Sequence, residues 1–193
     1  MTNFDRLIFI DLETTGASAA TDRITEIGLV EVSAGAVNRW SSLVNPGIPI
    51  PHFIQQLTGI DDMMVRDAPS FAQLQDALLQ RLNGALFIAH NARFDHGFLR
   101  NAFAESDHHL QCDVICTVKL SRKLFPGESK HNLDTLIERH RLQAESRHRA
   151  LADADLLWQL WRKLQAEIPE ELFERAIQAQ LPHYRSAAIN REP

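Results

Sequence analysis

An apolar run that ends in acidic residues near the N-terminus constrains the fold of this chain more than any other feature. Residues 7–10 read Leu-Ile-Phe-Ile and lead into Asp11, with Glu13 two positions later. An uninterrupted apolar run predicts a buried strand, and alternate residues of a strand point to one side. Both carboxylates are therefore expected on the same side of a buried strand, where ionised groups are costly unless they are paired or bound to metal.

Two further acidic fragments follow the same logic. The apolar run at 85–89 predicts a second strand, and the helical spacing of the apolar residues after it places Asp95 in the first turn of a helix. His148 and Asp153 are five residues apart, which on one helix would separate them by roughly 140°. We therefore expect His148 on a lead-in loop and Asp153 in the first turn of the helix that follows, where the helix dipole favours a carboxylate.

Four carboxylates and a histidine are the groups that a two-metal phosphodiester hydrolase needs. Two divalent cations about 4 Å apart require several anionic oxygen ligands. Taken singly, an Asp in such a position is more often a turn former or a helix cap, and a lone His is more often an ordinary surface or core residue. Several converging acids without compensating Lys or Arg in the motifs favour a metal site.

The three fragments resemble the motifs of the DEDDh, or DnaQ-like, 3′→5′ exonucleases, and in particular the proofreading epsilon subunit of bacterial DNA polymerase III. Residues 11–16 match Asp-x-Glu-Thr-Thr-Gly, residues 90–95 match His-Asn-Ala-x-Phe-Asp, and residues 148–153 match His-x4-Asp. The likeness extends through "RITEIGLVEV", "LTGI", "LFPG" and "HNLDTLIERH", and covers most of residues 5–165. It implies an RNase H-like exonuclease fold.

The resemblance also implies roles for the five residues. Asp11, Glu13 and Asp153 would hold a first metal ion, and Asp11 would reach a second ion that Asp95 supports through water. His148, with an ordinary pKa near 6.5, is suited to take a proton from the attacking water. Hard oxygen ligands favour Mg²⁺, with Mn²⁺ able to substitute. The product would be a nucleoside 5′-monophosphate.

Two substrate contacts are also implied by the family. Thr14 and Leu57 occupy the positions that contact the terminal nucleotide, although Thr58 stands where the epsilon subunit usually has His. The alternative for Leu57 is an ordinary core leucine one helical turn after Ile54.

Composition is consistent with one catalytic domain. The chain has 193 residues, of which 45% are hydrophobic, enough for a sizeable core. The N-terminal apolar run is too short for a signal sequence or a membrane span, so we expect a cytoplasmic protein without membrane association. Cys112 and Cys116 are too few for a disulfide framework. With His108 and His109 they form an alternative zinc cluster, whose spacing matches no standard finger.

The net charge is −5, whereas nucleic-acid enzymes usually have a basic surface. Bound cations would reverse the field at the acidic residues. Residues 119–149 contain eight Lys or Arg against four Asp or Glu, so this stretch is expected to follow the nucleic-acid strand unless it is merely a solvated helix face.

The predicted architecture is α/β, a five-stranded mixed sheet flanked by helices. Strands are expected at 6–11, 24–32, 37–44, 85–90 and 112–115, and helices at 71–82, 94–104, 117–124, 133–140 and 150–166. Residues 1–168 are expected to form the exonuclease domain, and 169–193 a C-terminal helix and a tail or linker.

The expected function is removal of nucleotides from single-stranded DNA 3′ ends, in proofreading or repair. Partners would be a polymerase subunit or a fused nuclease domain. Two alternatives stay open: the same chemistry on RNA, which shares these motifs, and a non-catalytic nucleic-acid-binding subunit. Loss of a motif acid or of His148 would favour the second, and none is lost.

Overall fold

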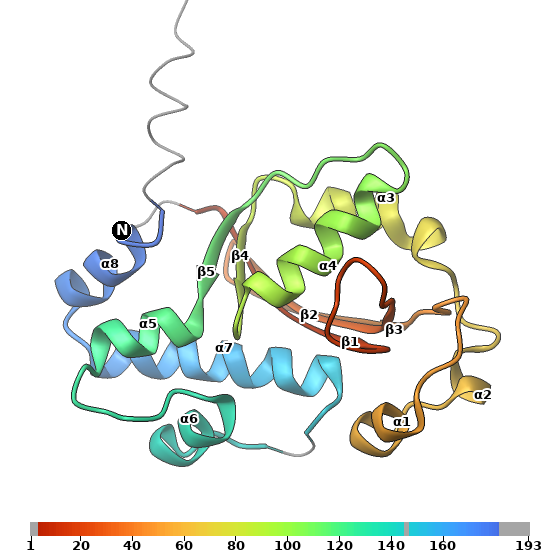
Figure 1. Cartoon of the computed structure of the whole chain (residues 1–193). Coiled ribbons are helices and arrows are strands. Elements are labelled where there is room, and N and C mark those ends of the chain that lie inside the picture. The colour runs from red at the N-terminus through yellow and green to blue at the C-terminus, as the bar shows by residue number, and fades with distance from the viewer. Residues whose placement is uncertain (1–3, 145–146, 182–193) are drawn as a thin grey trace, which may run out of the picture.

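A five-stranded mixed sheet forms the centre of the computed structural model, which describes residues 4–144 and 147–181 (Figure 1). The strands lie in the order β3-β2-β1-β4-β5. The first three form an antiparallel meander, and β4 and β5 run parallel to β1. The predicted sheet is confirmed, with strands at β1 Arg6–Thr14, β2 Ile24–Ser33, β3 Ala36–Leu43, β4 Leu86–Ala89 and β5 Asp113–Cys116.

Eight helices surround the sheet in the described part of the chain. The five predicted helices are present within one residue of their expected bounds. The helices are α1 His52–Thr58, α2 Asp62–Val65, α3 Phe71–Leu82, α4 Arg93–Ala104, α5 Thr117–Leu124, α6 Leu133–His140, α7 Ala150–Glu167 and α8 Glu170–Gln178. Across the described ranges, none of these helices has the length and apolar character that crossing a membrane requires.

Opposite faces of the sheet pack against different helices. On one face, Phe9 of β1 contacts Trp158 and Trp161 of α7, with ring centroids 5.3 and 5.8 Å apart. On the other face, neighbouring residues of β1 such as Ile8 and Ile10 lie in a second core with side chains of α3 and α4. Figure 1 shows α7 and α4 on these two sides. The end of β1 is therefore the place where residues from both layers meet.

β1 is longer than the apolar run predicted. Its pairing with β2 continues through Glu13 opposite Glu26 and ends at Thr14. Residues 12–14 are held in the strand by backbone hydrogen bonds to β2, and the length of an apolar run does not predict such pairing. Glu13 is consequently part of a strand, and the two-residue spacing from Asp11 places both carboxylates on the side that faces α7.

The C-terminal helix belongs to the same core. Phe173 of α8 is buried and packs edge-on against Trp161, with centroids 5.0 Å apart. Residues 182–193 lie outside the described residues, so the division at 168 and the tail or linker stay predictions.

Candidate active site

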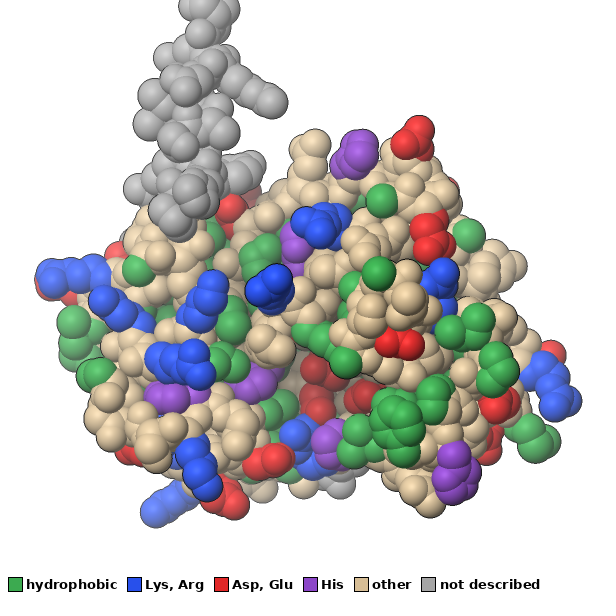
Figure 2. Space-filling view, viewed as in Figure 1, with side chains coloured by type: hydrophobic (Ala, Val, Ile, Leu, Met, Phe, Trp, Pro, Cys, Tyr) green, Lys and Arg blue, Asp and Glu red, His purple; other side chains and the backbone are tan. Residues whose placement is uncertain are grey.

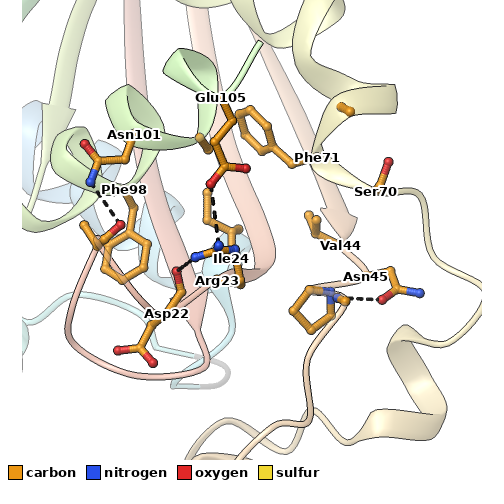
Figure 3. Close-up of a pocket in the computed structure, with 15 residues that line it drawn as sticks. Asp22, Arg23, Ile24, Val44, Asn45, Ser70, Phe71, Phe98, Asn101 and Glu105 are labelled. Carbon is orange, nitrogen blue, oxygen red and sulfur yellow. Dashed lines mark hydrogen bonds and ion pairs between the residues drawn. The ribbon is translucent and has the colours of Figure 1, made fainter.

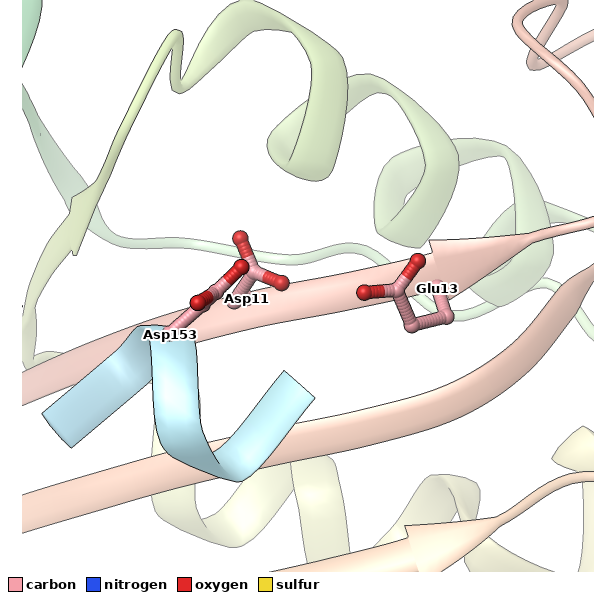
Figure 4. Close-up of side chains that lie close together, drawn as sticks. All are labelled: Asp11, Glu13 and Asp153. Carbon is pink, nitrogen blue, oxygen red and sulfur yellow. The ribbon is translucent and has the colours of Figure 1, made fainter. Parts of the chain in front are cut away.

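Three carboxylates from two distant segments converge at the end of β1. Asp11 and Glu13 extend from β1, and Asp153 lies in the first turn of α7, as the sequence predicts. One oxygen from each carboxylate lies within 4.8 Å of the others (Figure 4). Such a separation allows a single divalent cation to contact all three groups.

The fourth predicted acid lies beside this group. Asp95 is in the first turn of α4, as expected, and is 2% exposed. Burial raises the pKa of Asp95 to about 7, although the backbone N–H groups of Asp95 and Leu12 donate to its carboxylate and act in the opposite direction. The bond from Leu12 ties α4 to β1, so Asp95 is held next to Asp11.

The electrostatics of the four acids fit a bound cation. Burial and then the charges of Asp95, Asp153 and Glu13 raise the pKa of Asp11 well above its usual range. Burial and the charges of Asp153 and Glu26 raise the pKa of Glu13 to about 7. These acids disfavour each other's ionised form, and a divalent cation between them would relieve that repulsion. Asp11, Glu13, Asp153 and Asp95 therefore have the donor set that a metal site requires.

His148 lies on the loop that leads into α7, where the sequence places it. It is exposed, and its backbone is left-handed with φ 58°. A non-glycine residue in this region is strained and is held there by its surroundings. The neighbouring residue Arg149 provides that restraint.

A buried carboxylate on β2 anchors the start of α7, and sequence analysis missed it. Glu26 is 3% exposed and accepts hydrogen bonds from Arg149, the shortest being Nη2 to Oε1 at 2.7 Å and Nε to Oε2 at 3.0 Å. The N–H of Ala150, the first residue of α7, also donates to Oε2 at 2.9 Å. Glu26 thus caps α7 from another element and fixes the residues that follow His148.

Arg147, immediately before the third motif, provides a basic partner for one of the acids. Its guanidinium contacts the carboxylate of Asp153 and lies 3.0 Å from that of Asp134 on α6. Asp153 is therefore paired with an arginine that lies just before the third motif. The contact joins Arg147 to a residue six positions later, in the first turn of α7.

The two predicted substrate contacts differ in their exposure. The side chain of Thr14 is buried, and its hydroxyl donates to the carbonyl oxygen of Gly16 at 2.6 Å, which shapes the turn after β1. Leu57 is 53% exposed on α1, whereas Ile54 is buried. The alternative of a core leucine at 57 is therefore wrong. Contact of either residue with a nucleotide stays a prediction.

The alternative zinc cluster does not form among the described residues. The only grouping of three or more potential ligands there is that of Asp11, Glu13 and Asp153. His108 instead contacts the carbonyl oxygen of Ser106 at 2.7 Å. Burial and the charge of Asp113 raise the pKa of Cys112 to about 12, so this thiol is protonated at neutral pH.

The surface has an open hollow with acidic side chains, and a pocket lies elsewhere. Figure 2 shows acidic side chains inside the hollow, with basic, histidine and hydrophobic side chains around its edge. A separate pocket of about 260 Å³ lies between α3, α4 and the loop after β1 (Figure 3). Arg23 and Glu105 form an ion pair there at 3.6 Å. None of the predicted site residues lines this second pocket, so the candidate active site is the group of acids at the end of β1.

Comparisons with known proteins agree with this assignment. The model of the RNase T family, described as an exonuclease, matches residues 8–160. The 3′-5′ exonuclease DinG of Bacillus subtilis is 40% identical over 157 residues, which cover 80% of this chain and 17% of that protein. A PolC-type DNA polymerase III of Caldanaerobacter subterraneus subsp. tengcongensis is 36% identical over 164 residues, covering 84% of this chain and 12% of that protein. The chain thus spans less than a fifth of either relative.

Solved structures show the same fold. Exonuclease X in complex with 5′ overhanging duplex DNA has a TM-score of 0.69 and 28% identity, covering 89% of this chain and 99% of that one. Exonuclease I has a TM-score of 0.76 at 18% identity, covering 89% of this chain and 43% of that one. The family match covers all three acidic motifs and the RNase H-like sheet that joins them. The chain therefore belongs to the RNase T exonuclease family, and the DnaQ-like resemblance of its motifs is confirmed.

Proposed function

We propose that this chain is a metal-dependent 3′→5′ exonuclease that releases nucleoside 5′-monophosphates from DNA 3′ ends in proofreading or repair. The observation that carries the proposal is the convergence of Asp11, Glu13 and Asp153 within 4.8 Å at the end of β1. The relatives support the direction and the substrate: one is named a 3′-5′ exonuclease, and Exonuclease X is described in complex with DNA.

The four acids would hold two Mg²⁺ ions, or Mn²⁺ in their place. Asp11, Glu13 and Asp153 would contact one ion, and Asp11 with Asp95 would serve the other. When bound, such ions lower the pKa of water and stabilise charge on the attacking and leaving oxygens. Arg147 would have to release Asp153 for this, and it keeps a second partner in Asp134.

The protein's own residues supply the proton transfer and the positioning. His148 would accept the proton of the attacking water at an imidazole nitrogen, because it is exposed and lies on the loop that precedes Asp153. Glu26 holds the start of α7 through Arg149 and Ala150, and so fixes His148 relative to the acids. This function would place the protein in the cytoplasm, where DNA ends are processed, as a domain of a polymerase or of another nuclease, or as a separate enzyme.

The test is digestion of 5′-labelled single-stranded DNA and RNA of matched sequence with Mg²⁺, with and without EDTA. The proposal expects a ladder that shortens from the 3′ end of DNA, is abolished by EDTA and is weakened in His148→Ala. Faster digestion of RNA would replace the DNA assignment with an RNA one. No cleavage of either strand by a metal-bound protein would favour a non-catalytic binding subunit.

A further inference from the structure

An open groove runs along the exposed side of α4, and none of the four acids lines it. It has a volume of about 590 Å³ and is lined by Arg93, His96 and Arg100 of α4, by Asn91, and by the loop after β1 at residues 17 and 19. The three α4 positions are spaced by three and four residues, so they lie on one side of the helix. The groove is thus bounded by the loop after the first motif, at residues 17 and 19, and by the start of the second motif, at Asn91 and Arg93.

The groove has unpaired positive charge. Arg93 and Arg100 are exposed, and the side chain of neither makes an ion pair or a hydrogen bond within residues 4–144 and 147–181. No Asp or Glu of the described chain lines the groove. The two guanidinium groups therefore carry the positive charge of the groove.

Residues 119–149, which the sequence predicts to follow the nucleic-acid strand, differ from this groove because several of their positive charges are paired. Three of their arginines are already paired with acids: Arg139 with Glu128 at 3.0 Å, Arg147 with Asp153 and Asp134, and Arg149 with Glu26. The exposed Lys and Arg side chains of α5 remain in that stretch. Figure 2 shows basic and histidine side chains in the region of α4, and further basic side chains over α5.

The spacing of the two free arginines fits a nucleic-acid backbone. Seven residues of helix separate the Cα atoms of Arg93 and Arg100 by about 10 Å, so the two guanidinium groups can reach two different phosphates of one backbone. A guanidinium group can donate two hydrogen bonds to one phosphate, which makes arginine a strong phosphate ligand. Asn91, which also lines the groove, offers an amide donor.

We propose that the α4 groove binds the phosphate backbone of a nucleic acid whose 3′ end lies at the four acids. This inference rests on the proposed function, because it assumes that the acids receive a strand end. Arg93 and Arg100 each contact a phosphate, either of the strand being shortened or of its complement. The groove recognises the charge and spacing of the phosphates and makes no base-specific contact. Binding along it is therefore independent of the nucleic-acid sequence.

The test compares the double variant Arg93→Ala/Arg100→Ala with the wild type and with Arg66→Ala/Arg175→Ala. The control removes the same charge from two exposed arginines on other segments. Affinity for a single strand and for a duplex with a recessed 3′ end is measured by fluorescence anisotropy in Ca²⁺ at several salt concentrations, with the strand length checked afterwards. The groove variant should bind several-fold more weakly. The slope of log affinity against log salt should fall by about 0.7 per arginine for a single strand or about 0.9 for a duplex.

The outcomes show which strand the groove binds, and they distinguish failure of this proposal from failure of the proposed function. An equal loss for both substrates assigns the groove to the strand being shortened, and a loss on the duplex alone assigns it to the complement. An affinity and a salt slope equal to those of the control variant would overturn the proposal. The 5′-p-nitrophenyl ester of thymidine monophosphate is too short to reach the groove and tests the acids alone. If wild-type protein fails to hydrolyse it with Mg²⁺, the proposed function fails, while the salt slopes still report on the groove.

Discussion

Replacing Gly28 by alanine should displace the third motif without touching any acid. Gly28 lies on β2 opposite Asp11, and a Cβ atom there would be 2.1 Å from the backbone nitrogen of Leu151 and 2.2 Å from the carbonyl carbon of Ala150. Both neighbours are backbone atoms of α7, so no side-chain rotation relieves the contact. Ordinary contact begins at 3.4 Å, and the start of α7 must therefore move about 1.3 Å away from β2.

This displacement should affect catalysis more than folding. Asp153 lies two residues after Leu151, so it moves with the helix relative to Asp11. A misplacement of about 1 Å can reduce a rate about 100-fold, and this is the fall in kcat that we expect for removal of the terminal nucleotide. Overpacking costs about 1–3 kcal/mol, or about 2–4 °C in Tm for each kcal/mol in a chain of this size. Assays at 20 °C, together with a thermal melt of each variant, separate the two effects.

Gly127→Ala is the matched control, because a Cβ atom at this glycine meets nothing within 4 Å. It should have the kcat and Tm of the wild type. Mn²⁺ affinity, measured by electron paramagnetic resonance, provides a readout that does not depend on DNA cleavage. It should weaken in Gly28→Ala but not in Gly127→Ala. If Gly28→Ala has the kcat and the Mn²⁺ affinity of the wild type, the close packing of α7 on β2 does not set the position of the third motif.

Three further predictions concern the acids and their partners. His148→Ala should lose most turnover but keep metal and DNA binding, whereas Asp11→Ala should also lose Mn²⁺ binding in calorimetry; full activity in the histidine variant would exclude it as the base. Glu26→Gln removes the charge that anchors α7 and should lower kcat about tenfold with little change in KM in a steady-state assay, which corresponds to about 1.4 kcal/mol; an unchanged kcat would argue against a positioning role. Because the folded pKa values of Glu13 and Asp95 are raised to about 7, the metal-free native state binds more protons than the unfolded chain. Its Tm in EDTA should therefore fall as pH rises from about 4 to 7, and Mn²⁺ should remove most of that fall; a Tm that rises over this range would contradict the assignment.

The secondary structure and the four acids were predictable because their signals are local. Apolar runs and helical spacing record which residues face the core, and these patterns placed Asp11 on a strand, and Asp95 and Asp153 in helical first turns. The short helices α1 and α2 were not predicted, because they are too short for periodicity to register. α1 ends at Thr58 and is followed by Gly59 with φ 70°, and Asp61 caps α2 by accepting from the N–H of Met64.

The residues that orient the site were not predictable, because their partners are distant in sequence. Glu26 interrupts an apolar strand, and a buried charge requires a partner, but no local pattern identifies Arg149 as that partner. Arg147 likewise meets Asp153 only because its loop turns back over α7.

Alternate residues of β2 account for the position of α7. Glu26 and Gly28 face the helix from the same side of the sheet, one with a carboxylate that caps its first N–H and the other without a side chain to hold it away. The hydrogen bonds to Glu26 fix the position of α7 along β2, and the absence of a side chain at Gly28 lets the helix pack close to the sheet. His148 and Asp153 flank this contact, so the third motif is positioned by β2 as well as by its own sequence. Variants of Glu26 and Gly28 should therefore weaken the same metal site by different physical routes, the first through lost charge pairing and the second through steric displacement.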